Sequence, residues 1–310
     1  MRVDKILCRF YPIRKNLSQA FFFFSLIYWK ALNSYIAPIC DRGALYDEKG
    51  PLMYQETSKK MAMRAVEKMN FLKNNLFGFM LSSMMAGAYV GVGIILILTL
   101  GNDFAPEYRN LVMGCFFGIA LTLIVFSGAE LFSGHTMVMT FGFLHKRIKL
   151  HEVIYDWFMC WQGNLFGAIL LSILFVLGGG GGWVHDSTSL VHQISDHKIN
   201  STIIELVARG ALCNWLICLA IWMVTRTEND MAKCMLIFWC LFAFIAAGFE
   251  HGVANMSVFT ISMLGAHSPD VTLLGICYNL FWVSIGNIIG GSGFIGVAYH
   301  LTGSSDQYIE

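Results

Sequence analysis

The sequence predicts an all-α integral membrane protein with six transmembrane helices, and its composition and long apolar runs carry that prediction. Of the 310 residues, 56% are hydrophobic and 13% are charged, and the mean hydropathy is +0.60. Soluble globular chains average roughly 25% charged residues. The apolar runs are continuous rather than alternating with polar residues, which excludes a membrane β-barrel. The net charge of +1 gives no indication of a nucleic-acid partner, and the 9 cysteines form no C-x-x-C pair, so we expect no disulfide framework, metal site or cofactor.

The N-terminal segment differs from the rest of the chain. Several cations precede an apolar run at residues 20–29, which at about ten residues is too short to cross a membrane. We interpret residues 1–52 as a disordered or spurious extension, with Met53 as the natural start. Residues 55–73 place apolar side chains at helical spacing with lysines and an arginine between them, which predicts an amphipathic interfacial helix. The rest of the chain then divides into an interfacial helix, a six-helix membrane domain and a short cytoplasmic tail, at residues 53–75, 76–300 and 301–310.

Two of the six expected spans are interrupted by polar residues. The apolar flanks around Glu250 and His251 are each shorter than the about 20 residues that a spanning helix needs. Irregular backbone at membrane depth occurs only where it is buried in protein or lines a cavity, so we expect broken helices near residues 127–136 and 248–256. Lysine and arginine concentrate before the first span and after the second and fourth, which places both termini in the cytoplasm. The expected spans are residues 76–100, 111–143, 153–177, 202–224, 231–264 and 271–299.

The chain also repeats itself. Gly163-Asn-Leu-Phe-Gly167 recurs as Gly286-Asn-Ile-Ile-Gly290, and Gly128-Ala-Glu130 recurs as Gly248-Phe-Glu250, each about 120 residues later. Three spans per unit is an odd number, so the second unit must enter the membrane from the opposite side. This predicts an inverted 3+3 repeat with a polar site near the midplane, where the two broken helices meet.

Ionisable residues inside the membrane are candidates for function. His251 is the first of them, because imidazole titrates near neutral pH and can give or take a proton. Asn255 follows four residues later and is placed to orient the ring. Glu130 and Glu250 each lie in one of the breaks, and we interpret both as structural, hydrogen-bonded to free backbone amides.

Other residues near the breaks are candidates for a substrate pathway. Ser133 and Thr136 offer hydroxyl groups, either as caps of the second half-helix or as pore-lining donors. Lys198 precedes the fourth span and Asn214 lies inside it, and a cation at a pore mouth attracts anions. His135 is a second candidate for titration. The apolar side chains that either pack the core or constrict a pore are Phe117, Leu121, Leu131, Phe132 and Phe244.

At these residues the sequence resembles the formate/nitrite transporter family. The motifs are Ser127–Thr136 (SGAELFSGHT), Gly248–Met256 (GFEHGVANM) and the two Gly-Asn-x-x-Gly repeats. The sequence is most similar to the family's bacterial nitrite transporter branch, over Ala86–Asn102 and Gly210–Trp222. The resemblance covers the chain from about Met53 to the end of the sixth span and is absent from the N-terminal extension.

The resemblance implies a homopentamer of aquaporin-like protomers in the bacterial cytoplasmic (inner) membrane. Each protomer would have its own pore for small monovalent anions or their conjugate acids. The family's central histidine falls at His251 and its orienting asparagine at Asn255, while Lys198 matches the vestibule lysine and Asn214 its partner. The hydroxyl of the first break falls at Ser133, where the family usually has threonine. The five apolar residues named above match the family's two constrictions.

These features favour proton-linked transport of nitrite and not enzymatic activity. Lys198 would draw in the anion, an apolar slit would favour the neutral form of the weak acid by desolvation, and His251 or water associated with it would supply the proton. Formate or another small weak acid, such as lactate or hydrosulfide, is the first alternative. A membrane oxidoreductase with His135 and His251 as haem ligands and a purely structural membrane scaffold are the others.

Overall fold

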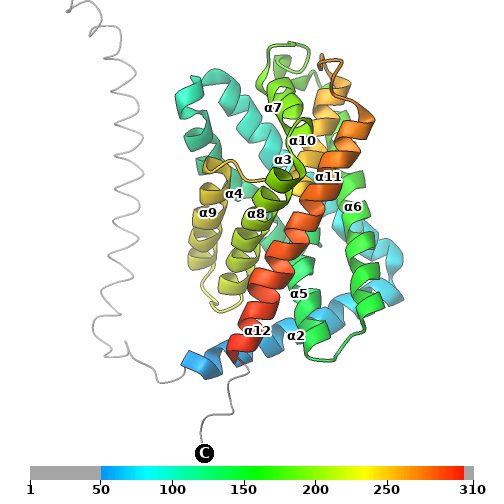
Figure 1. Cartoon of the computed structure of the whole chain (residues 1–310), viewed down its shortest axis with the longest axis vertical. Coiled ribbons are helices and arrows are strands. Elements are labelled where there is room, and N and C mark those ends of the chain that lie inside the picture. The colour runs from blue at the N-terminus through cyan, green and yellow to red at the C-terminus, as the bar shows by residue number, and fades with distance from the viewer. Residues whose placement is uncertain (1–49, 304–310) are drawn as a thin grey trace, which may run out of the picture. The chain divides into compact units, whose positions relative to one another are not determined.

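The computed structural model describes residues 50–303, with side chains for residues 54–302. Residues 1–49 of the expected extension 1–52 and residues 304–310 of the expected tail 301–310 lie outside the described residues. Helix α2 begins at Gly50, within the expected extension, and α12 reaches Gly303, within the expected tail. Within them every regular element is helical (Figure 1). The elements are α2 (Gly50–Asn74), α3 (Leu76–Asp103), α4 (Pro106–Ser127), α5 (Phe132–Leu144), α6 (Leu150–Leu177), η1 (Gly180–Gly182), α7 (Leu190–Ile199), α8 (Ile203–Val224), α9 (Asp230–Ala246), α10 (Gly252–Leu264), α11 (Leu273–Ile288), η2 (Ile289–Val297) and α12 (Ala298–Gly303).

Five helical segments in the described residues are long and apolar enough to cross a membrane, which agrees with a multi-pass membrane protein. They are α3, α4, α6, α8 and the run Leu273–Thr302, in which α11, η2 and α12 follow one another. Two further apolar helices, α9 and α10, have 17 and 13 residues. Each is shorter than the about 20 residues that a span requires.

Both predicted helix breaks are present. Residues 128–131 separate α4 from α5, and residues 247–251 separate α9 from α10. Gly128 and Gly248 have φ angles of +73° and +71°, in the left-handed region that glycine adopts without a steric penalty. Equivalent glycines therefore follow the two α-helices within two residues of their ends, as the repeated Gly-x-Glu sequence predicted.

Three features of the fold differ from the sequence prediction. α4 begins at Pro106, before the expected Leu111, because proline at the first helical position lacks only an amide that has no helical partner there. A separate helix, α7, precedes the fourth span. The last span contains the π-helical segment η2, in which a Cβ on Gly291 would lie 2.0 Å from Oγ1 of Thr136. Only glycine lets these two segments approach so closely.

The helix α2 lies across one end of the bundle, and α7 lies at the opposite end (Figure 1). Arg64 of α2 donates a hydrogen bond to Oγ1 of Thr225 at 2.9 Å, and Lys73 pairs with Glu152 of α6. The buried face of α2 includes Met61, Ala65, Met69 and Leu72. These contacts attach α2 to the helices beside it, while its position at a membrane interface remains a prediction.

Candidate functional site

The backbone at the first break is held by the asparagine of the first Gly-Asn-x-x-Gly motif. Asn164 on α6 accepts a hydrogen bond from the amide of Phe132 at 2.9 Å. Its Nδ2 donates to the carbonyls of Glu130 at 2.9 Å and Ser83 at 2.8 Å. A helix end inside a membrane has backbone groups without helical partners, and one buried side chain satisfies two of them here, at Phe132 and Glu130, while also binding a carbonyl within α3.

The asparagine of the second motif makes the same contacts at the second break. Oδ1 of Asn287 accepts from the amide of Gly252 at 3.0 Å, and its Nδ2 donates to the carbonyls of Glu250 at 3.2 Å and Gly210 at 2.8 Å. We expected the glutamate side chains to bind the free amides. That interpretation is wrong for these two amides, because the motif asparagines bind them and the carboxylates face other partners.

The glycines of the motifs allow close helix packing. A Cβ on Gly167 would lie 1.8 Å from the carbonyl oxygen of Met84, and one on Gly290 would lie 2.1 Å from that of Ala211. Small residues permit such backbone approach in membrane helices. The motif therefore places its asparagine at the break and fixes the distance between α6 and α3, and between η2 and α8.

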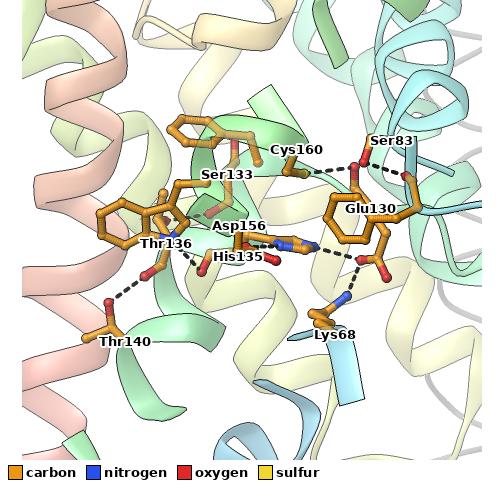
Figure 2. Close-up of polar contacts among 12 residues, drawn as sticks. Lys68, Ser83, Glu130, Ser133, His135, Thr136, Thr140, Asp156 and Cys160 are labelled. Carbon is orange, nitrogen blue, oxygen red and sulfur yellow. Dashed lines mark hydrogen bonds and ion pairs between the residues drawn. The ribbon is translucent and has the colours of Figure 1, made fainter. Parts of the chain in front are cut away.

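The carboxylate of Glu130 belongs to a chain of ionisable side chains (Figure 2). It pairs with Lys68 of α2 and lies 2.7 Å from Nε2 of His135. Nδ1 of the same imidazole lies 2.7 Å from Oδ2 of Asp156 on α6. His135 is 2% exposed and Asp156 is 0% exposed, so the histidine is buried between two acids.

The carboxylate of Glu250 has one cation and neutral amides around it. Nζ of Lys198 on α7 lies 2.5 Å away, and Nδ2 of Asn255 donates to the carboxylate at 2.6 Å. Asn255 also donates to Asn279 at 2.9 Å, and Asn279 donates to the carbonyl of Lys198 at 2.9 Å. The side chain of Asn255 thus binds Glu250 and Asn279, and not His251 as we expected from its spacing along the helix.

His251 connects the two breaks. Its Nε2 lies 2.5 Å from Oγ of Ser133, and the histidine is 4% exposed. The residue before α5 in the cap position is Leu131, and no side-chain hydrogen bond caps this helix. Ser133 therefore does not cap α5, and its hydroxyl contacts His251, while a pore-lining role stays a prediction.

Thr136 and Asn214 lie beside this contact. Thr136 donates to the carbonyl of Ser133 at 2.7 Å, and Nδ2 of Asn214 donates to Oγ1 of Thr136 at 2.9 Å and to the carbonyl of Asn287 at 2.6 Å. The expected pairing of Asn214 with Lys198 is wrong, because the asparagine that binds the Lys198 segment is Asn279. Asn214 instead joins α8 to α5 and to α11.

Two cavities share part of their lining, and the smaller of them reaches His251. The larger one, of about 550 Å³, is lined by Lys68, Glu130 and His135 together with apolar residues, and we call it the α2-side vestibule. The smaller one, of about 10 Å³, is lined by His251 and is about large enough for a single water. Three apolar residues line both cavities and lie at their boundary: Leu121, Ile124 and Leu131.

The predicted constriction residues separate into two groups. Phe117, Leu121, Leu131 and Phe244 line the small cavity, and the rings of Phe117 and Phe244 meet edge to face with centroids 5.5 Å apart. Phe132 is buried but does not line either cavity. Instead, the backbone amide of Phe132 donates a hydrogen bond to Asn164.

The sequence interpretation missed three residues of the site. Asp156 lies within the predicted third span, and an ionisable residue there was by itself a reason to single it out. Lys68 was one of several cations on an amphipathic helix, and only its pairing with Glu130 distinguishes it. Asn279 lies eight residues before its motif asparagine, as Asp156 does, and this spacing was the signal that could have found it; its partners come from α7 and α10.

Comparisons with known proteins identify what the chain is similar to. A family model described as formate/nitrite transporter matches residues 55–301. The nitrite transporter NirC of Escherichia coli (strain K12) is 48% identical over 247 residues, which are 80% of this chain and 91% of that protein. The formate channel BtFdhC of Bacillus thuringiensis is 30% identical over 236 residues, 74% of this chain and 88% of that protein.

Solved structures agree with these matches. A chain described as an FNT family ion channel has a TM-score of 0.78 and 48% identity, covering 79% of this chain and 98% of that one. A pentameric formate channel with formate bound has a TM-score of 0.61 and 26% identity, covering 74% and 98% of the two chains.

Proposed function

The chain belongs to the formate/nitrite transporter family, which confirms the resemblance of its motifs, and from this premise we propose that it transports nitrite across the bacterial cytoplasmic membrane. The observation that carries the choice of nitrite is 48% identity to a nitrite transporter over nearly that protein's whole length. The relatives named above are transporters and channels, so we assign no enzymatic activity.

The proposed route leads from the α2-side vestibule through the apolar boundary to His251. Lysines near both ends of the route, Lys68 and Lys198, attract a small anion. In the apolar boundary, desolvation disfavours the charged form of the acid. His251, hydrogen-bonded to Ser133, or water associated with it, then supplies the proton, so that a near-neutral species crosses. Phe117 and Phe244 exclude bulk water from this position.

We further propose six spans in an inverted 3+3 repeat, assembled as a homopentamer. Support for the repeat comes from the equal contacts of Asn164 and Asn287 at the two breaks, and from the packing of α3 on α6 and of α8 on α11. Support for the pentamer comes from the pentameric formate channel, whose fold is similar. The distribution of lysine and arginine supports cytoplasmic termini, and with them a cytoplasmic α2-side vestibule.

Formate is the second candidate substrate, because a formate channel of the family is 30% identical to this chain. Purified full-length protein in proteoliposomes should take up labelled nitrite faster than empty liposomes, and an inward proton gradient should increase the rate. Labelled formate measured in parallel separates the two substrates. Formate uptake without nitrite uptake would overturn the choice of nitrite, and no uptake of either anion would overturn the transport proposal.

A further inference from the structure

The contacts of the cluster Lys68–Glu130–His135–Asp156 call for a proton that the proposed route does not use (Figure 2). Both nitrogens of His135 lie 2.7 Å from a carboxylate oxygen. An ionised carboxylate can only accept a hydrogen bond, and a neutral imidazole has only one N–H to donate. The two hydrogen bonds therefore require one additional proton, on the ring or on one of the two acids.

That proton balances the charge of the vestibule. Among the described residues, the vestibule lining contains three cations and three carboxylates: Arg64, Lys68, Lys233, Glu67, Glu130 and Glu228. Asp156 lies directly behind this lining and adds a fourth negative charge. With the additional proton the charges cancel, and without it the wall of the vestibule carries one net negative charge.

The other groups packed around this cluster are uncharged, so the additional proton is shared among His135 and its two acids. From α3 the ring of Phe79 meets the imidazole edge to face at 6.0 Å, and from α6 the thiol of Cys160 donates to the carbonyl of Glu130 at 3.3 Å. Neither group is charged in these contacts. The charged groups facing His135 are Glu130, Asp156 and, beyond Glu130, Lys68. Because His135 itself lines the vestibule, the proton can exchange with water there.

The second break shows what the same framework looks like without such a proton. Asn255 lies five residues after Glu250, as His135 lies five after Glu130. Asn279 precedes the motif asparagine by eight residues, as Asp156 does in the first half. The pair Asn255–Asn279 makes the corresponding contacts with two neutral amides. The titratable pair is therefore a feature of one end of the route only.

We propose that His135, held between Glu130 and Asp156, is a pH-sensitive positioning residue that regulates anion entry from the α2-side vestibule. At low pH on that side the cluster keeps its proton and the vestibule wall is neutral. As the pH rises the proton leaves to water, the wall becomes negative, and an approaching anion is repelled. A net charge in a cleft changes the entry rate of a charged ligand by about tenfold or more at low ionic strength.

The experiment rests on the proposed nitrite transport and uses the full chain. Right-side-out and inverted membrane vesicles give access to each side, and the initial rate of nitrite uptake is measured while the pH of one side varies and the other is fixed. The test variant is the double substitution His135→Asn and Asp156→Asn, which reproduces the amide pair of the second break and keeps the cluster's net charge at zero. Glu67→Gln is the matched control, because it changes the vestibule charge without touching the histidine.

The wild-type rate should fall several-fold more on raising the pH of the α2 side than on raising that of the other side. The double variant should lose this difference between the sides, while Glu67→Gln should keep it at a shifted absolute rate. A double variant with the wild-type difference between the sides would overturn the inference while leaving nitrite transport intact. Wild-type vesicles that transport no nitrite would instead overturn the proposed function.

A second measurement does not depend on the folding of a variant. Infrared spectra of the purified wild-type protein, labelled with ¹³C-histidine or ¹³C-aspartate, should show a buried imidazole and a buried carboxyl that change together with pH. A buried histidine and aspartate whose bands stay constant from pH 5 to pH 9 would overturn the inference as well.

Discussion

The two helix breaks share one framework and carry different chemistry. In each, a glycine with positive φ lies just after the first half-helix, a glutamate follows two residues later, and a motif asparagine binds the backbone. The residue after the glutamate is Leu131 in the first break and His251 in the second. The backbone framework thus repeats, while the side chains that face the proposed route differ.

We propose that this difference separates residues that hold the fold from residues that act on a substrate. The motif asparagines have equal partners in both halves, so their role is to satisfy backbone groups. His251 and Ser133 have no counterpart of the same kind, since Leu131 and Val253 occupy the equivalent positions. We therefore place the transport chemistry where the two halves differ.

The largest effect should come from filling the close helix contacts. Gly167→Ala and Gly290→Ala each force a Cβ into a backbone carbonyl, at 1.8 and 2.1 Å, and each should cost about 3 kcal/mol of stability. Gly293→Ala, in open space on η2, is the control and should be neutral. Thermal unfolding of detergent-purified protein measures this, and equal stability of all three variants would contradict the close packing.

The second-largest effect should come from replacing His251. His251→Asn removes the group that gives or takes the proton, and proton-dependent nitrite uptake should fall by about 100-fold. Proteoliposome uptake at several pH values measures the rate, and size-exclusion chromatography checks that the variant assembles as wild type. A variant that keeps the wild-type pH dependence would show that the histidine takes no part in proton transfer.

Replacing the motif asparagines tests directly whether the two helix breaks are equivalent. Asn164→Ala and Asn287→Ala each leave buried backbone groups without partners and should each cost about 1–3 kcal/mol. If the two breaks are equivalent, the two losses of unfolding free energy should agree within about 0.5 kcal/mol. A loss at one break alone would limit the framework role to that break.

The smallest effect should come from the hydroxyl at the first break. Ser133→Ala removes the hydrogen bond to Nε2 of His251 and should cost about 1 kcal/mol in transport activation, which is about fivefold in rate. Ser133→Thr keeps the hydroxyl and should retain most of the rate. Equal rates in the alanine and threonine variants would mean that the hydroxyl does not position the histidine.

The helix breaks were predictable because their signals are local. Polar residues and glycines within an apolar run require a buried interruption, and the repetition of Gly-x-Glu and Gly-Asn-x-x-Gly identified both breaks and their supporting helices. His251 could be singled out for the same reason, since an imidazole at membrane depth needs a buried environment.

Only the tertiary structure decided which side chains meet. Asn214 binds Thr136 rather than Lys198, Asn255 binds Glu250 rather than His251, and Asp156 binds His135. Most of these partners come from different helices, so helical spacing does not predict them. The amino-acid sequence by itself determined where the helices break, because that depends on local polarity, whereas the pairing of polar groups depends on how the helices pack across the bundle.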